Sequence, residues 1–178
     1  MKLLKTFEDK DIFPSVKAIN HADFRERLAA RAVLFDQDKN IALLHVTKYN
    51  YHKLPGGGVE EGESNEQGLS RELLEETGCK TEIKEEIGEI IEYRDKYKIK
   101  NDSFCWIAEV IGEKEALNFM EDEVEEGFEL EWTSLSEAIR KIGNDDPGDY
   151  QGFFIKQRDL LFLKEAEKLI KEKNGERS

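Results

Sequence analysis

The stretch LPGGGVEEGESNEQGLSRELLEETGC, residues 54–79, joins a run of glycines to a glutamate-rich segment with strong helix signals. Ser64 and Gln67 have the spacing of a capping box, and Gly78 stands where a helix is expected to stop. Between these two signals, residues 65–77 are mostly helix-favouring. The sequence therefore predicts a glycine turn followed by a helix.

Three carboxylates are predicted to share one face of this helix. Residues three and four positions apart lie on the same side of a helix, so Glu72, Glu75 and Glu76 project toward one small volume. Leu69 and Leu73 turn the opposite side toward a core. Crowded carboxylates repel one another, and a hard divalent cation such as Mg²⁺ or Mn²⁺, which prefers oxygen ligands, relieves that repulsion.

The glycines form the second part of this candidate site. Gly56, Gly57 and Gly58 have access to backbone angles closed to other residues, which lets a carbonyl or an amide approach a metal or a phosphate closely. The plain alternative is a solvated acidic helix after a glycine turn. An acidic pattern considered alone favours that alternative, so the spacing of the whole stretch has to decide.

Composition limits the partners that the chain can have. Its 178 residues include 27 Lys+Arg and 40 Asp+Glu, a formal net charge of −13, and no basic block is separated from the acids. This charge repels a phosphate backbone, which argues against a nucleic acid polymer as partner. A small anionic substrate is compatible with it where metal cations bridge the substrate to the acidic groups.

The cysteines and the apolar pattern indicate the cellular setting. Cys79 and Cys105 lie outside any CxxC pair, which predicts two buried free thiols in a reducing compartment. The first residues, MKLLKTFEDKDIF, turn charged too early for a signal peptide, and no apolar run is long enough to span a bilayer. We therefore expect a cytoplasmic protein without a membrane partner.

Outside the opening stretch, β-prone runs alternate with helical segments, which predicts one α/β layered domain over residues 1–178. The expected strands are two in a hairpin within 28–49, turning at 36–40, and others within 81–95, 102–112 and 128–135. The expected helices are 136–142, capped by Ser134 or Ser136, and an amphipathic C-terminal helix at about 152–173. Its apolar stripe, predicted to dock on the domain, consists of Phe162, Leu163, Ala166, Leu169 and Ile170.

The spacing of the opening stretch favours a functional site over a plain acidic helix. From Gly57 it reads glycine, five residues, Glu63, seven residues, Arg71-Glu72-Leu73, one residue, Glu75-Glu76, one residue, Gly78 and Cys79. This pattern resembles the Nudix box at every fixed position, although the closing residue is usually a larger aliphatic than Cys79. The preceding hairpin and the later ELEWTSLSEAI, residues 129–139, extend the likeness over about residues 29–142.

The resemblance implies the Nudix fold, an α/β/α sandwich around a mixed β-sheet. It also implies a Mg²⁺-dependent hydrolase, with Mn²⁺ as the alternative ion, that cleaves a nucleoside diphosphate linked to another group, X. A nucleoside di- or triphosphate is the expected substrate, and dinucleoside polyphosphates, ADP-ribose and nucleotide sugars are the alternatives. Two alternatives of other classes are an inactive nucleotide-binding module and a simple acidic cation binder, and the intact box argues against both. A monomer or a homodimer is expected.

By the same resemblance, the box supplies the metal site and the catalytic groups. The implied metal ligands are Gly56, Gly57, Glu72, Glu75, Glu76 and Glu126. Arg71 is implied to orient the carboxylates, and Glu63 to be a structural partner of the box. The base that activates water is implied to be Glu72 or a glutamate in a later loop, where Glu126 is preferred over its close rivals Glu123 and Glu125.

The substrate contacts are predicted less directly. Tyr93 and Tyr97 follow the box where an aromatic ring can stack on a base, although packing against neighbouring side chains is the favoured explanation for tyrosines on a strand. Lys53 ends a polar segment, residues 48–53, where a loop before the box can contact phosphates or base. These three residues are the candidate substrate-binding set.

Overall fold

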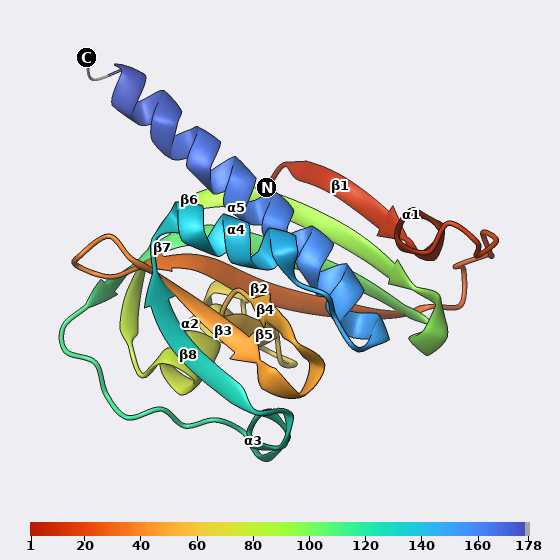
Figure 1. Cartoon of the computed structure of the whole chain (residues 1–178), viewed down its shortest axis with the longest axis horizontal. Coiled ribbons are helices and arrows are strands. Elements are labelled where there is room, and N and C mark those ends of the chain that lie inside the picture. The colour runs from red at the N-terminus through yellow and green to blue at the C-terminus, as the bar shows by residue number, and fades with distance from the viewer. Residues whose placement is uncertain (177–178) are drawn as a thin grey trace.

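A mixed eight-stranded sheet forms the centre of the protein in the computed structural model, which describes residues 1–176 (Figure 1). Its spatial order is β1-β6-β7-β2-β3-β4, with β5 paired to β2 and β8 paired to β3. The strands are β1 (Leu3–Glu8), β2 (Arg25–Phe35), β3 (Ile41–Val46), β4 (Tyr51–Lys53), β5 (Gly56–Gly58), β6 (Lys80–Arg94), β7 (Ile99–Ile111) and β8 (Phe128–Thr133). The β1–β6 and β2–β7 pairs are parallel, whereas β6–β7 and β3–β8 are antiparallel.

Helices cover both faces of this sheet (Figure 1). The helices are α1 (Asp9–Ile12), α2 (Asn65–Thr77), α3 (Glu121–Glu126), α4 (Leu135–Asn144) and α5 (Tyr150–Glu176), with short 3₁₀ turns at Thr47–Tyr49 and Asp95–Tyr97. Leu69 and Leu73 of α2 pack on one face in a cluster with Trp106, while Phe162 and Leu163 of α5 pack on the other in a cluster with Val33. This arrangement confirms the predicted α/β/α sandwich.

The local signals in the sequence are confirmed at the box helix. Helix α2 covers residues 65–77, and the Ser64 hydroxyl accepts from the Gln67 amide while the Gln67 side chain accepts from the Ser64 amide. Gly78 ends the helix in the left-handed conformation with φ of 64°. Because both ends are fixed by local hydrogen bonds, the direction in which α2 presents its glutamates is fixed as well.

The other predicted elements are present with shifted boundaries. The hairpin of β2 and β3 turns at residues 36–40, and α4 begins at Leu135 with Ser134 as its cap. The predicted apolar stripe of the C-terminal helix does dock, because Phe162, Leu163 and Ala166 are buried on the sheet. Strand β6 is shifted by one residue from its predicted range, and β7 begins three residues earlier than predicted and ends one residue earlier.

Two segments differ from expectation. The expected strands begin only after residue 27, yet β1 pairs with β6 and extends the sheet beyond residues 29–142, over which the likeness to the family was predicted. The acidic segment at 121–126, expected as a loop, forms the one-and-a-half-turn helix α3, closed by Gly127 in the left-handed conformation. Within residues 1–176, no helix has both the length and the apolar character needed to cross a bilayer.

Candidate active site

Two glutamates of α2 meet one glutamate of α3 at the edge of the sheet. Carboxylate oxygens of Glu72, Glu76 and Glu123 all lie within 4.8 Å of one another. Glu76 is fully buried, whereas Glu72 and Glu123 are partly exposed along a cleft. Three carboxylates at this separation form an all-oxygen donor set, which suits a hard divalent cation and not zinc.

Glu76 is held from the opposite side by β4 and β5. Its Oε1 atom lies 2.8 Å from the Nζ atom of Lys53, and its Oε2 atom accepts from the backbone amide of Gly56. Burial raises the pKa of the Glu76 carboxyl, and Lys53 and the Gly56 amide oppose that shift. The pairing therefore helps to keep a buried carboxylate charged inside the fold.

Arg71 connects the carboxylates of the box to the loop that precedes α2. Its Nε and Nη2 atoms donate to the two oxygens of Glu63 at 2.9 and 3.0 Å, a bidentate pair. Its Nη1 atom donates to Glu72 at 2.9 Å and to Glu75 at 3.5 Å, and Nη2 also reaches the carbonyl of Gly58. Arg71 thus contacts three carboxylates of the box, and its orienting role stays a prediction.

The glycines allow close approach at two points. Gly56 has φ of +126°, and a side chain there would collide with the backbone of Ala30 and Arg31 on β2. A Cβ atom on Gly57 would lie only 2.5 Å from the carboxyl carbon of Glu72. Because both residues lack a side chain, the glycine turn can lie directly against β2 and the Glu72 carboxylate.

The comparison with known protein families decides the family. The family model described as the NUDIX domain matches residues 25–153. The chain belongs to the Nudix family. This match extends the likeness beyond the box at both ends, to β2 on one side and to the first turn of α5 on the other.

Known relatives and solved structures agree with this assignment. The chain is 30% identical over 120 residues to diphosphoinositol polyphosphate phosphohydrolase 2 of Rattus norvegicus, covering 67% of this chain and 63% of the relative. The chain thus spans less than two thirds of the length of that curated relative. A NUDIX hydrolase from Nitrosomonas europaea has a TM-score of 0.55 at 23% identity, covering 67% of this chain and 79% of that one. A MutT NUDIX hydrolase from Burkholderia pseudomallei has a TM-score of 0.57 at 18% identity, covering 79% and 98%.

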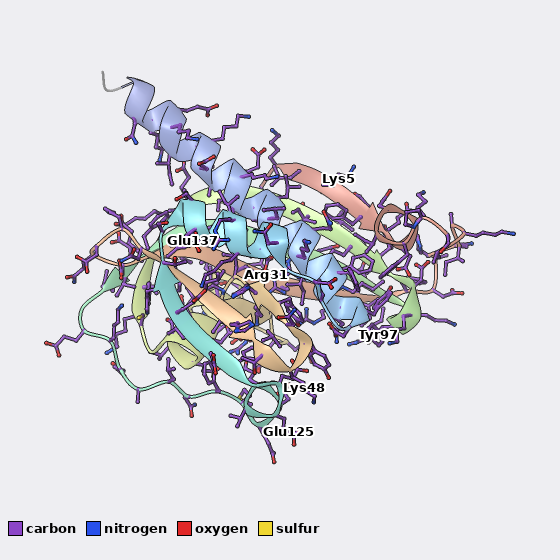
Figure 2. All side chains as sticks on the ribbon, viewed as in Figure 1. Lys5, Arg31, Lys48, Tyr97, Glu125 and Glu137 are labelled. Carbon is purple, nitrogen blue, oxygen red and sulfur yellow. The ribbon has the colours of Figure 1, made fainter. Side chains whose placement is uncertain are left out.

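The structure separates the three candidate glutamates of the acidic segment that faces the Nudix box. Glu123 belongs to the three-carboxylate cluster, whereas Glu126 lines the same cleft outside that cluster. Burial, followed by the charges of Asp122 and Asp149, raises the pKa of Glu126. Glu125 is exposed, at the end of the molecule where α3 lies (Figure 2). Because the segment forms a helix, the carboxylate of Glu123, rather than that of Glu126, joins the carboxylates of the box. The sequence prediction had assumed a loop here.

The candidate substrate-binding residues have different surroundings. The ring of Tyr93 stacks on His21, with centroids 4.3 Å apart and an interplanar angle of 13°, so packing accounts for this tyrosine. Tyr97 is 42% exposed at the rim of a cavity beside the Nudix cleft, and its ring meets Tyr150 edge-on. Lys53 lines both the cleft and the cavity.

Sequence reasoning missed a set of arginines that line this neighbouring cavity, which has a volume of about 300 Å³. Arg25, Arg27 and Arg31 come from one face of β2, and Arg94 comes from the end of β6. The signal was present as arginines at odd positions in RERLAAR, residues 25–31, because alternate residues of a strand share a face. Although the sequence has no basic block, pairing of β2, β6 and β7 gathers these charges in space.

Proposed function

We propose that this Nudix chain hydrolyses a phosphoanhydride bond of a small phosphorylated substrate with the help of Mg²⁺ or Mn²⁺. The observation that carries the proposal is the cluster of Glu72, Glu76 and Glu123 beside Arg71. An all-oxygen set formed by two helices is suited to hard divalent ions. When bound, such ions would neutralise charge on the transferred phosphoryl group and make a bound water more acidic.

The residues of the box have distinct roles in this proposal. Glu72, Glu76 and Glu123 would hold the ions, and Glu75 would join them as an outer carboxylate next to Arg71. The backbone of Gly56 and Gly57 would add polar groups at the same edge, as the Nudix resemblance implies. Arg71 would keep the Glu72 carboxylate turned toward the cluster, since it fixes Glu72 and Glu63 together.

A base that accepts the proton from water is also needed. We assign this role to Glu126, because it lines the cleft and its pKa is raised. A raised pKa makes its carboxylate a stronger base than an ordinary glutamate. Glu72 is the alternative base within the box. Lys53 would contact a substrate phosphate from the opposite wall, where its ammonium lies over the ring of Phe128 and beside Glu76.

For the substrate, a nucleoside di- or triphosphate remains our first proposal, with the exposed ring of Tyr97 as the platform for a base. A specific observation favours a second candidate, a more densely phosphorylated molecule of the kind named for the Rattus norvegicus relative. The arginine-lined cavity opens beside the metal cleft, where such a molecule would place further phosphates. We also propose a cytoplasmic monomer or homodimer; the buried free thiols of Cys79 and Cys105 support a reducing compartment.

A panel assay tests the proposal. Substrate cleavage would be measured with and without Mg²⁺ on nucleoside triphosphates, dinucleoside polyphosphates, ADP-ribose, nucleotide sugars and a diphosphoinositol polyphosphate, with all products separated and identified by mass. We expect metal-dependent cleavage of one class, a loss of at least about a hundredfold in Glu72→Gln, and no loss in Glu66→Gln, an exposed position on the same helix. Nucleotide binding without cleavage of any compound would instead support the regulatory-module alternative.

A further inference from the structure

The arginine-lined cavity differs in charge from the neighbouring Nudix cleft, which contains the carboxylate cluster. Its buried lining side chains include two arginines, Arg31 at 5% and Arg94 at 7% exposed, and they lie beside the neutral side chains of Asn101 and Tyr51. Figure 2 shows Arg31 in the middle of the fold and Tyr97 at the edge of the molecule. Acidic lining residues are present too, but Asp122, Glu126 and Asp149 are partly or fully exposed and come from α3 and the loop before α5. The cavity therefore has a basic floor and an acidic rim.

The floor of the cavity and the residues behind it contain more positively charged groups than negatively charged ones. Glu92 is fully buried and pairs with Arg94 at 3.1 Å and with Arg158 at 3.4 Å, while Asp159 pairs with Arg158 at 2.7 Å. Arg27 and Arg31, in contrast, donate to neutral groups, namely the Asn101 side chain at 2.8 Å and the Gly56 carbonyl at 2.9 Å. Among these described residues, two buried carboxylates thus face four guanidinium groups.

Some buried hydrogen-bond donors of these arginines also have no acceptor. Within residues 1–176, the Nε atoms of Arg31 and Arg94 are buried without a hydrogen-bond partner, and so is the Nη2 atom of Arg158 behind them. Buried donors are almost always paired in native proteins, and each such exception calls for an explanation. Arginines that are both nine-tenths buried and short of acceptors are typical of a site that receives an anion.

The position of the cavity connects it to the metal cleft. Lys53, Gly56 and Gly57 line both spaces, together with Arg27 at the junction. A substrate with its scissile phosphates at the carboxylate cluster would therefore extend another group over the arginines. Among the cavity-lining aromatic residues within 1–176, Tyr97 has a large exposed surface, whereas Tyr51 is buried and Phe128 lies under Lys53.

We propose that Arg27, Arg31 and Arg94 form a subsite for a second phosphoryl group of the substrate, one that is not hydrolysed. This inference rests on the proposed function and deepens it. It places a phosphate of the group X over the arginines, at the position where a nucleoside substrate would place its uncharged base. The preferred substrates are then molecules with a phosphoanhydride and at least one further phosphoryl group a short distance away.

A metal-free binding experiment tests the subsite separately from catalysis. Inorganic phosphate and tripolyphosphate would be titrated in EDTA, where the carboxylate cluster cannot hold them through a cation. We expect both to bind the wild-type protein, Arg27→Gln to weaken binding at least about tenfold, and Arg27→Lys to restore part of it. Arg27 is partly exposed and its hydrogen bond goes to a neutral side chain, so the variants are expected to fold. Arg140→Gln, which removes an exposed arginine of α4, is the matched control.

A second readout tests the substrate class. With Mg²⁺ present, kcat/KM would be compared for a diphosphoinositol polyphosphate and for UDP-glucose, whose sugar has no further phosphate. We expect the ratio of the two values to fall at least about tenfold in Arg27→Gln. An unchanged ratio, or the absence of metal-free phosphate binding to wild type, would overturn the subsite. If wild type cleaved no compound, the proposed function would fail, while the EDTA titration would still decide the subsite.

Discussion

The ammonium group of Lys53 on β4 lies 2.8 Å from the buried carboxylate of Glu76 on α2, and this pair joins the sheet to the helix of the Nudix box. Both groups lie where water has little access, so their pairing offsets part of the cost of burying two charges. The same carboxylate belongs to the cluster with Glu72 and Glu123. A divalent cation at the cluster would thus provide a second positive partner for Glu76.

The first prediction concerns this pair. Lys53→Met should destabilise the metal-free protein by about 3–5 kcal/mol, because it leaves a buried carboxylate without its partner. Mg²⁺ should recover part of the loss, and the recovery should exceed the effect of Mg²⁺ on wild type. Urea unfolding with EDTA or with Mg²⁺ measures both quantities, and Lys48→Met, at an exposed position, is the control. Equal Mg²⁺ effects in wild type and variant would remove Glu76 from the proposed ligand set.

The second prediction separates the glutamates of α3. Glu123→Gln should lower the affinity for Mn²⁺ at least about tenfold, because it removes charge from the three-carboxylate cluster. Glu121→Gln, at an exposed position on the same helix, should change it less than about twofold. Calorimetric titration with Mn²⁺ measures these affinities. If Glu126→Gln had the larger effect instead, Glu126 would return as the ligand that the sequence pattern favoured.

The third prediction uses the bidentate pair of Arg71 and Glu63. Hydrogen bonds from Arg71, and then from the Glu60 amide, lower the pKa of Glu63 from 4.5 to about 2. Because the folded-state pKa is the lower one, ionised Glu63 stabilises the fold above about pH 4.5, and this contribution disappears as pH falls toward 2. The difference in Tm between wild type and Glu63→Gln should therefore be largest near neutral pH and shrink across that interval. Glu61→Gln, in the same loop and exposed, should show no such trend.

The fourth prediction concerns the close approach of Gly57 to Glu72. Gly57→Ala would push a methyl group against the Glu72 carboxylate, and a displacement of this kind should lower turnover by about a hundredfold. Since the collision is with a partly exposed side chain, circular dichroism should show an intact fold. Gly143→Ala has open space on α4 and should leave turnover unchanged and stability equal or slightly higher. Full activity in Gly57→Ala would show that the position of Glu72 does not limit catalysis.

Features that depend on local chemistry could be predicted from the amino-acid sequence. The capping box at Ser64, the stop at Gly78 and the glutamates at helical spacing are all set by residues a few positions apart, so α2 and its acidic face could be predicted. The spacing of the whole box then indicated the Nudix family, and the α/β/α fold could be predicted from that resemblance.

The distant residues that complete the site are brought together by long-range packing, which the sequence did not reveal. Glu123 reaches the cluster because the acidic segment forms α3 beside β8, and Lys53 is drawn to Glu76 by the pairing of β4 with β3. Arg27 and Arg94 line the same cavity because β2 pairs with β7 and β7 pairs with β6, although the two arginines are 67 positions apart in the chain. Strand pairing is a long-range interaction fixed by packing over the whole sheet, so no local pattern specified these neighbours.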